Sequence, residues 1–189
     1  MQKLHHIKPL HSRQEIASAK LYFKQGKMGQ RNLLIFIIGL NTGLMCRDIV
    51  SLKVNDIIHQ KRPYIIEHNT GKKRQLDLTN IYQEIQKYIV DNNLSDDNYL
   101  FPSRSHNVSS HLSVNGFYKV VKRVGRQLGR NDLDTHTMRK TFGYFYYQTT
   151  HDISTLRIIF HHNSEQFTKN YIGIFNTEDN KNFLKDFKL

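Results

Sequence analysis

The apolar residues of this chain recur at helical spacing along most of its length, and one stretch, residues 54–78, breaks that pattern. A helix face repeats every three or four residues, whereas a strand alternates every two. Within the exceptional stretch, Val54–His59, Pro63–Glu67 and Arg74–Leu78 are expected to form three short antiparallel strands. Asn69-Thr70-Gly71 provides the second turn. The pattern predicts a mainly α-helical α+β fold with a small three-stranded antiparallel sheet.

The helical segments have recognisable starts. Ser12 and Glu15 form a capping box, and Ser113 precedes a helix with an apolar stripe on one side. Helices are expected at 12–24, 31–40, 45–52, from Thr79 onward, and at 113–128, 136–148, 153–160 and 165–171, with a last amphipathic segment that contains Phe183, Leu184 and Phe187. We expect one domain over 1–189, with an N-terminal helical extension at 1–30 and a C-terminal amphipathic tail at 175–189.

Composition narrows the function. The chain has 28 Lys+Arg against 16 Asp+Glu, a formal net charge of +12 and a pI near 9.8, which favours a polyanionic partner. A basic protein with no nucleic acid partner is the alternative. The single cysteine, Cys46, excludes an intramolecular disulfide and cysteine-rich zinc sites. The apolar run Leu33–Ile38 is far shorter than the ~18 residues of a membrane span. Without a secretory signal, the expected location is the cytoplasm.

Four residues in the C-terminal half supply a set of chemical groups, namely His136, Arg139, His162 and Tyr171. A tyrosine can attack phosphorus, an arginine can hold charged oxygens, and histidines can move protons. Alone, Tyr171 would more often be a core aromatic, and His162 beside His161 would more often be structural. Their joint order points to cleavage and rejoining of DNA strands.

The blocks around these residues resemble the catalytic domain of the tyrosine recombinases, or phage-type integrases. The resemblance covers about residues 31–174. It rests on Asn41-Thr42-Gly43-Leu44, Asp48-Ile49-Val50-Ser51-Leu52-Lys53, Thr70-Gly71-Lys72, Leu100-Phe101-Pro102-Ser103, His136-Thr137-Met138-Arg139-Lys140-Thr141-Phe142, and His162 through Tyr171-Ile172-Gly173-Ile174. The last two blocks are the most specific.

The resemblance implies a mechanism. Tyr171 would attack the scissile phosphate and form a 3′-phosphotyrosyl link, which a second strand would reverse. Arg139 would clamp two oxygens, His136 would assist proton transfer, and His162 would donate a hydrogen bond to the phosphate. Neither a cofactor nor a metal is implied.

Two positions depart from the family pattern. The first catalytic arginine is expected directly after Thr-Gly-Leu, where this chain has Met45. Arg47 is the candidate catalytic substitute. It lies two positions on, about 200° around a helix, so it would face away unless the local backbone differs. A lysine is expected before Thr70, where this chain has Asn69. Lys72, past the turn, is the candidate general acid for the leaving 5′-oxygen; its alternative role is that of a basic tip.

Further basic residues are candidate DNA contacts. They are Lys73 and Arg74 in the hairpin, Lys119, Lys122, Arg123 and Arg126 in the 113–128 helix, and Lys140. A solvated face opposite the core stripe is an equal alternative for the helix. The expected partners are double-stranded DNA, further copies of this chain as a dimer or tetramer on DNA, and a partner recombinase, with no membrane. Only about 30 residues precede the resemblance, so we expect no clamp domain there and salt-sensitive binding.

Three alternatives to a site-specific recombinase remain open. The missing arginine favours an impaired relative that binds DNA, or a partner recombinase, without efficient cleavage. A relaxing topoisomerase would use the same chemistry. A histidine-based metal enzyme would draw on the eleven histidines, although these lack a coherent ligand spacing.

Overall fold

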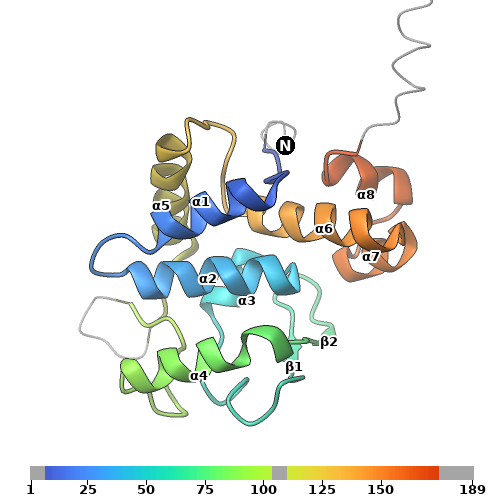
Figure 1. The fold of residues 1–189 in the computed structure, drawn as a ribbon. Helices are drawn as coiled ribbons and strands as arrows, with labels where there is room; N and C mark the ends of the chain where they lie inside the picture. Colours follow the sequence, from blue (N-terminus) through green and yellow to red (C-terminus); the bar gives the residue numbers. More distant parts are fainter. Residues whose placement is uncertain (1–6, 104–109, 175–189) are drawn as a thin grey trace, which may run out of the picture.

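The computed structural model describes residues 7–103 and 110–174, and helix α2 (Gly29–Thr42) lies at the centre of the fold (Figure 1). The helices that pack against α2 are α1 (Arg13–Phe23), α3 (Cys46–Val50), α4 (Tyr82–Asp91) and α6 (His136–Thr150). The 3₁₀ turn η2 (Thr79–Ile81) precedes α4 and also contacts α2. Residues of α2 such as Ile35 and Ile38 are fully buried because neighbours cover the helix on several sides.

The remaining helices flank this centre at opposite ends (Figure 1). Helix α5 (Val114–Gln127) packs against α1 and α3. Helices α7 (Ile153–Phe160) and α8 (Glu165–Tyr171) pack against each other, and α7 contacts α6. The predicted tail at 175–189, with Phe183, Leu184 and Phe187, lies outside the described residues.

Local capping explains where several helices begin. The hydroxyl of Ser12 accepts a hydrogen bond from the Glu15 amide at 3.0 Å, and that of Ser113 accepts one from Gly116 at 3.0 Å. Ser164 caps α8 in the same way at 3.1 Å. These bonds satisfy amides that have no partner within the helix. Both serine caps predicted from the sequence, at Ser12 and Ser113, are confirmed.

The sheet is smaller than predicted. It consists of β1 (Tyr64–Ile66) and β2 (Lys73–Gln75), paired antiparallel with Ile65 opposite Arg74. The predicted strand Val54–His59 is wrong, because this segment forms turns in which the amides of Ile57 and Ile58 bond back to the Val54 carbonyl. Val54 and Ile57 are both fully buried, and their three-residue spacing is that of a helical turn. The mainly helical fold with a small antiparallel sheet is otherwise confirmed.

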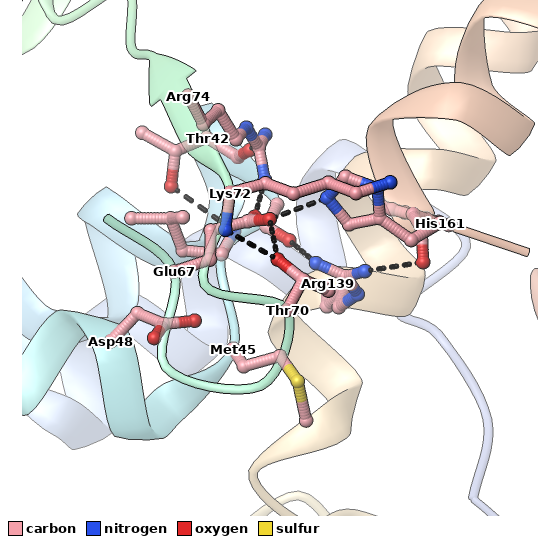
Figure 2. Close-up of polar contacts among 12 residues, drawn as sticks. Thr42, Met45, Asp48, Glu67, Thr70, Lys72, Arg74, Arg139 and His161 are labelled. Carbon is pink, nitrogen blue, oxygen red and sulfur yellow. Dashed lines mark hydrogen bonds and ion pairs between the residues drawn. The ribbon is translucent and has the colours of Figure 1, made fainter. Parts of the chain in front are cut away.

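The apolar interior has two parts. The larger core surrounds α2 and includes Phe36 and Phe117. A smaller core lies among α6, α7 and α8 and consists of Ile153, Leu156, Phe160 and Ile172, with Tyr171 packed against it. No helix within the described residues is long and apolar enough to cross a membrane. The end of α2 lies between the hairpin and the smaller core, and the candidate site is there (Figure 2).

Candidate active site

The site is organised around the C-terminal end of α2. Gly43 ends the helix with a left-handed backbone, φ 62°, which favours glycine. The last carbonyls of a helix lack partners and carry partial negative charge, so they attract cations. The carbonyl of Gly43 accepts a hydrogen bond from Arg139 Nη1 at 2.7 Å, and the adjacent carbonyl of Thr42 accepts one from Arg74 Nη2 (Figure 2). Two guanidinium groups are therefore held by consecutive peptide units.

Arg139 comes from the first turn of α6 and is only 6% exposed. Its Nη2 donates to the Phe160 carbonyl at 3.1 Å, and its guanidinium lies over the Phe160 ring at 4.2 Å. Burial lowers the pKa of Arg139, and the charge of Arg74 acts in the same direction. An arginine nevertheless stays charged at neutral pH. The predicted phosphate clamp is thus a fixed cation.

Arg74 extends into the site from β2 and is held there by a buried carboxylate. Its Nη1 donates to Glu67 Oε1 at 3.0 Å, and Glu67 Oε2 also contacts His161 Nε2 at 2.5 Å. The side chain of Glu67 is 5% exposed and that of Arg74 is 14% exposed. Burial alone would raise the pKa of Glu67, but the hydrogen bonds from Arg74 and His161 outweigh it and lower the pKa. The carboxylate is therefore ionised and fixes Arg74 in place.

Tyr171, the last residue of α8, lies over the smaller core with its hydroxyl 3.4 Å from His136 Nδ1. Its ring contacts those of Phe160 and His162, with centroids 5.6 Å and 4.9 Å away. Burial raises the pKa of Tyr171 to about 12, although the positive charge of Arg139 acts in the opposite direction. The phenol is therefore protonated at neutral pH and needs a base to act as a nucleophile.

The two histidines are both neutral at pH 7. Burial lowers the pKa of His136 below 6.5, an effect that Asp134 opposes. Burial, with the charges of Arg139 and His161, lowers the pKa of His162 to about 4. The Thr168 hydroxyl donates to the Ser164 carbonyl at 3.0 Å, so Nδ1 of His162 is the donor in its 3.1 Å contact with Thr168. This tautomer leaves Nε2 of His162 as the nitrogen able to meet a substrate.

The two positions that depart from the family pattern contact each other. Asn69 Nδ2 donates to the sulfur of Met45 at 2.9 Å. Arg47, on α3, is exposed and has no contact with Arg139 among the described residues. Lys72 is exposed on the hairpin, and its side chain has no ion pair within the described part of the chain.

Among the predicted DNA contacts, Lys73 of the hairpin is exposed, with its ammonium 4.5 Å from the centre of the Tyr64 ring. The predicted contacts outside the hairpin fall into two groups. Lys119, Arg123 and Arg126 are exposed on α5, and Lys122 donates to the Asn131 carbonyl at 2.8 Å. Lys140, in contrast, is 4% exposed; its ammonium donates to the Ile7 carbonyl at 2.8 Å and lies 4.7 Å from the centre of the Tyr171 ring. Lys140 is thus part of the surroundings of Tyr171 rather than of an open surface.

Sequence reasoning missed Glu67 and His161, and it treated Arg74 only as a candidate DNA contact in the hairpin. A signal for two of them exists in the strand period. Glu67 follows the buried Ile65 by two residues, and Arg74 precedes the buried Leu76 by two. Both charged residues therefore share the inward face of the hairpin. Among residues 7–103 and 110–174, no three His, Cys, Asp or Glu side chains are grouped as metal ligands.

A partly buried tyrosine and two histidines lie close to two guanidinium groups held at the end of α2, and together they form a site suited to chemistry on a phosphodiester. The model of the Phage integrase family matches residues 13–178. The probable integrase/recombinase YoeC of Bacillus subtilis (strain 168) is 35% identical over 173 residues, which cover 90% of this chain and 92% of that protein. The chain therefore belongs to the phage integrase family.

Solved structures agree on the fold. The XerH site-specific recombinase bound to difH substrate matches with a TM-score of 0.68 and 22% identity, over 94% of this chain and 54% of that one. The XerA recombinase matches with a TM-score of 0.69 and 18% identity, over 97% of this chain and 67% of that one. The chain thus spans about half the length of XerH. It matches tyrosine recombinases in architecture.

Proposed function

We propose that this protein is a site-specific DNA recombinase that cleaves and rejoins strands through a covalent bond to Tyr171. The observation that carries the proposal is the contact between the Tyr171 hydroxyl and His136 Nδ1, at 3.4 Å, beside the buried guanidinium of Arg139. A nucleophile, a neutral base and a fixed cation are the three groups that a phosphoryl transfer without a metal requires. Membership of the phage integrase family supports the same chemistry.

In the proposed step, Tyr171 Oη attacks the scissile phosphorus and its proton passes to His136. The new bond joins the tyrosine oxygen to phosphorus, and the bond from phosphorus to the 5′-oxygen breaks. The leaving oxygen takes a proton and becomes a 5′-hydroxyl, for which the ammonium of Lys72 is the proposed donor. Attack by the 5′-hydroxyl of another strand reverses each change and restores the phosphodiester.

Arg139 would neutralise the nonbridging oxygens with its fork of N–H groups. A phosphodiester next to His162 would raise the pKa of that histidine above its value of about 4. Its Nε2 could then carry a proton and donate to the phosphate. The substrate would therefore complete the electrostatics of the site.

Double-stranded DNA is the proposed substrate. XerH was solved bound to difH substrate, and a lambda integrase was solved as a dimer bound to a core site. The net charge of +12 and the exposed Lys119, Arg123 and Arg126 of α5 support contact with phosphates. A dimer or tetramer on paired sites, in the cytoplasm, is the proposed setting. Arg47, predicted as a catalytic substitute for the missing arginine, is exposed on α3, and we propose that it contacts DNA approaching this helix.

The experiment uses nicked suicide substrates made from DNA that flanks the gene, so that cleavage traps the covalent adduct. We expect a covalent protein–DNA band for the unmodified protein and none for Tyr171→Phe, which should bind the same DNA with nearly the same affinity. Tyr147→Phe, at a partly buried tyrosine on α6, is the matched control and should keep the band. A band that persists in Tyr171→Phe would contradict the nucleophile assignment.

A second candidate is a DNA-binding or regulatory protein on the recombinase fold. The observation that favours it is the uncharged contact between Met45 and Asn69, at positions where the family pattern expects an arginine and a lysine. This candidate predicts a specific gel shift on the flanking DNA without any covalent band. The same pair of measurements therefore separates the two functions.

A further inference from the structure

We infer that Arg74 is the second guanidinium that binds the scissile phosphate, in place of the arginine that the family pattern expects at residue 45. This inference rests on the proposed function, because it assigns a ligand to the same phosphate. It also makes Glu67 and His161 positioning residues, which act on the phosphate only through Arg74. Arg74 lies on β2, in a different element from the expected arginine, so the replacement involves a new direction of approach.

The first support is the place of the guanidinium. Arg74 and Arg139 donate to the carbonyls of Thr42 and Gly43, which are consecutive along the chain (Figure 2). Consecutive α-carbons lie about 3.8 Å apart, so the two carbonyls that hold the guanidinium groups are close neighbours. The charge of Arg74 is near enough to lower the pKa of Arg139. Arg62, which begins the same hairpin, is different: its side chain is 67% exposed and pairs with Asp77 at the surface.

The second support is the number of donors that remain. A guanidinium carries five N–H groups. Among the described residues, Arg74 uses one for Glu67 and one for Thr42. Each terminal nitrogen of Arg74 therefore has one protein acceptor that fixes it, while the other N–H groups can reach a substrate. A planar fork held in this way matches the bidentate geometry of a phosphate.

The third support is charge. Two guanidinium groups side by side repel each other, and a purely structural pair between Arg74 and Glu67 does not require Arg74 to approach Arg139. Buried ion pairs of that kind can be replaced by apolar residues without loss of stability. An anion bound between the two guanidinium groups would relieve the repulsion. The arrangement is therefore one that gains from a phosphate.

Glu67 and His161 fix the direction of Arg74. Glu67 holds Nη1 at 3.0 Å, and His161 occupies the second carboxylate oxygen. The next residue along the hairpin, His68, is anchored as well, because its amide and ring nitrogen both contact Asp48 of α3 at 2.9 Å. With these contacts the strand cannot withdraw Arg74 without breaking several hydrogen bonds.

The test is an NMR titration of the ¹⁵N-labelled full chain with inorganic phosphate, followed through the arginine Nε–Hε signals. We expect the signals of Arg74 and Arg139 to shift together with one dissociation constant, while that of Arg62 stays in place. Movement of Arg139 alone, or of neither arginine, would overturn the assignment. Because this measurement uses the unmodified protein, it does not depend on whether a variant folds.

Variants give the second readout. Arg74→Lys keeps a charge for Glu67 but lacks the fork, and should weaken phosphate binding about tenfold. Arg62→Lys is the control and should leave the affinity unchanged; equal affinities in the two variants would also overturn the inference. Covalent adducts at Tyr171 are scored in parallel. Paired shifts without any adduct would count against the proposed function only, and adducts with a shift of Arg139 alone would count against Arg74 only.

Discussion

Asn69 donates a hydrogen bond to the sulfur of Met45 at 2.9 Å, which joins the two positions where the family pattern expects charged side chains. The two departures are therefore one local change. A cation at residue 69 facing a thioether would lack a strong acceptor, since methionine sulfur accepts only weakly. Because this contact carries no charge, the cation that can approach the phosphate is Arg74, which comes from β2.

The inference that Arg74 replaces the arginine expected at residue 45 can be tested by placing an arginine at residue 45. Arg74→Gln should reduce the initial rate of covalent adduct formation by about 10²–10³, the range for loss of one preorganised donor. Met45→Arg should change the unmodified protein little but recover at least about tenfold in the Arg74→Gln background, because both side chains would serve one phosphate. Independent, multiplicative effects of the two substitutions would contradict this.

The pH dependence of cleavage should follow His136. Its pKa is lowered, so the ring stays neutral, and able to accept the Tyr171 proton, to below pH 6.5. We expect cleavage rates at DNA concentrations well below saturation, which report the DNA-free protein, to stay level from pH 8 to about 6.5. They should fall tenfold per unit once the pH drops below the lowered pKa. His136→Gln should be slower and should lose this acid limb. An unchanged acid limb in that variant would assign the titration to another group.

Glu67→Gln should destabilise the fold, because it leaves the nearly buried Arg74 without its counter-ion. The expected loss is about 3 kcal/mol, the low end for a broken buried pair. The pKa of Glu67 is lowered below 4.5, so its contribution is present above pH 4.5 and disappears as the pH falls through the lowered value. Urea unfolding should show that the difference in unfolding free energy between the unmodified protein and Glu67→Gln is smaller in acid than at pH 7. Asp77→Asn, at the exposed Arg62 pair, should have little effect at either pH.

Two glycines with similar backbones form a matched pair. Gly43 has φ 62° and a Cβ there would lie 2.3 Å from the Phe142 ring, whereas Gly71 has φ 64° and open space around it. Gly71→Ala should cost about 1 kcal/mol in unfolding free energy, for the backbone alone. Gly43→Ala should cost about 1–3 kcal/mol more because the core is overpacked. Equal losses in thermal unfolding would mean that Phe142 moves aside freely.

The exposed cations of α5 should account for part of the salt dependence of DNA binding. Removing Arg123 or Lys119 should lower the slope of log K against log[salt] by about 0.9 for each phosphate that is no longer neutralised. Lys87→Ala on α4, where Lys87 pairs with Asp91, is the control and should leave the slope unchanged. If all three variants keep the original slope, the α5 face is simply solvated.

The helices could be predicted because capping residues close in sequence mark where they begin. The expected segments Ile153–Phe160 and Glu165–Tyr171 match α7 and α8, which begin after the capping residues Asp152 and Ser164. The predicted strand at 54–59 failed for the opposite reason. Val54 and Ile57 suit strands by residue type, and the bond from the Val54 amide to the Asn98 carbonyl, a contact between distant parts of the chain, helps to fix the turn.

The site was predictable in residue type but not in its connections. The order of His136, Arg139, His162 and Tyr171 indicated the chemistry, and the structure brings the hydroxyl of Tyr171 toward His136. The link from Glu67 to His161 joins residues 94 apart in sequence, and no local pattern reports such a contact. The spacing of Arg74 from the buried Leu76 could have predicted that its side chain points inward. It could not have predicted that Arg74 donates to the Thr42 carbonyl.

Because Arg74 and Arg139 donate to the carbonyls of two consecutive planar peptide units, their separation depends mainly on the two backbone angles of Gly43, which joins those units. The hairpin and α6 can therefore shift relative to each other by small amounts while the two cations keep their spacing. The end of α2 would therefore keep the distance between the two cations constant when a bound phosphate moves. If the proposed cleavage takes place, a tolerance of this kind would let the two cations follow a phosphate that moves as the DNA bends.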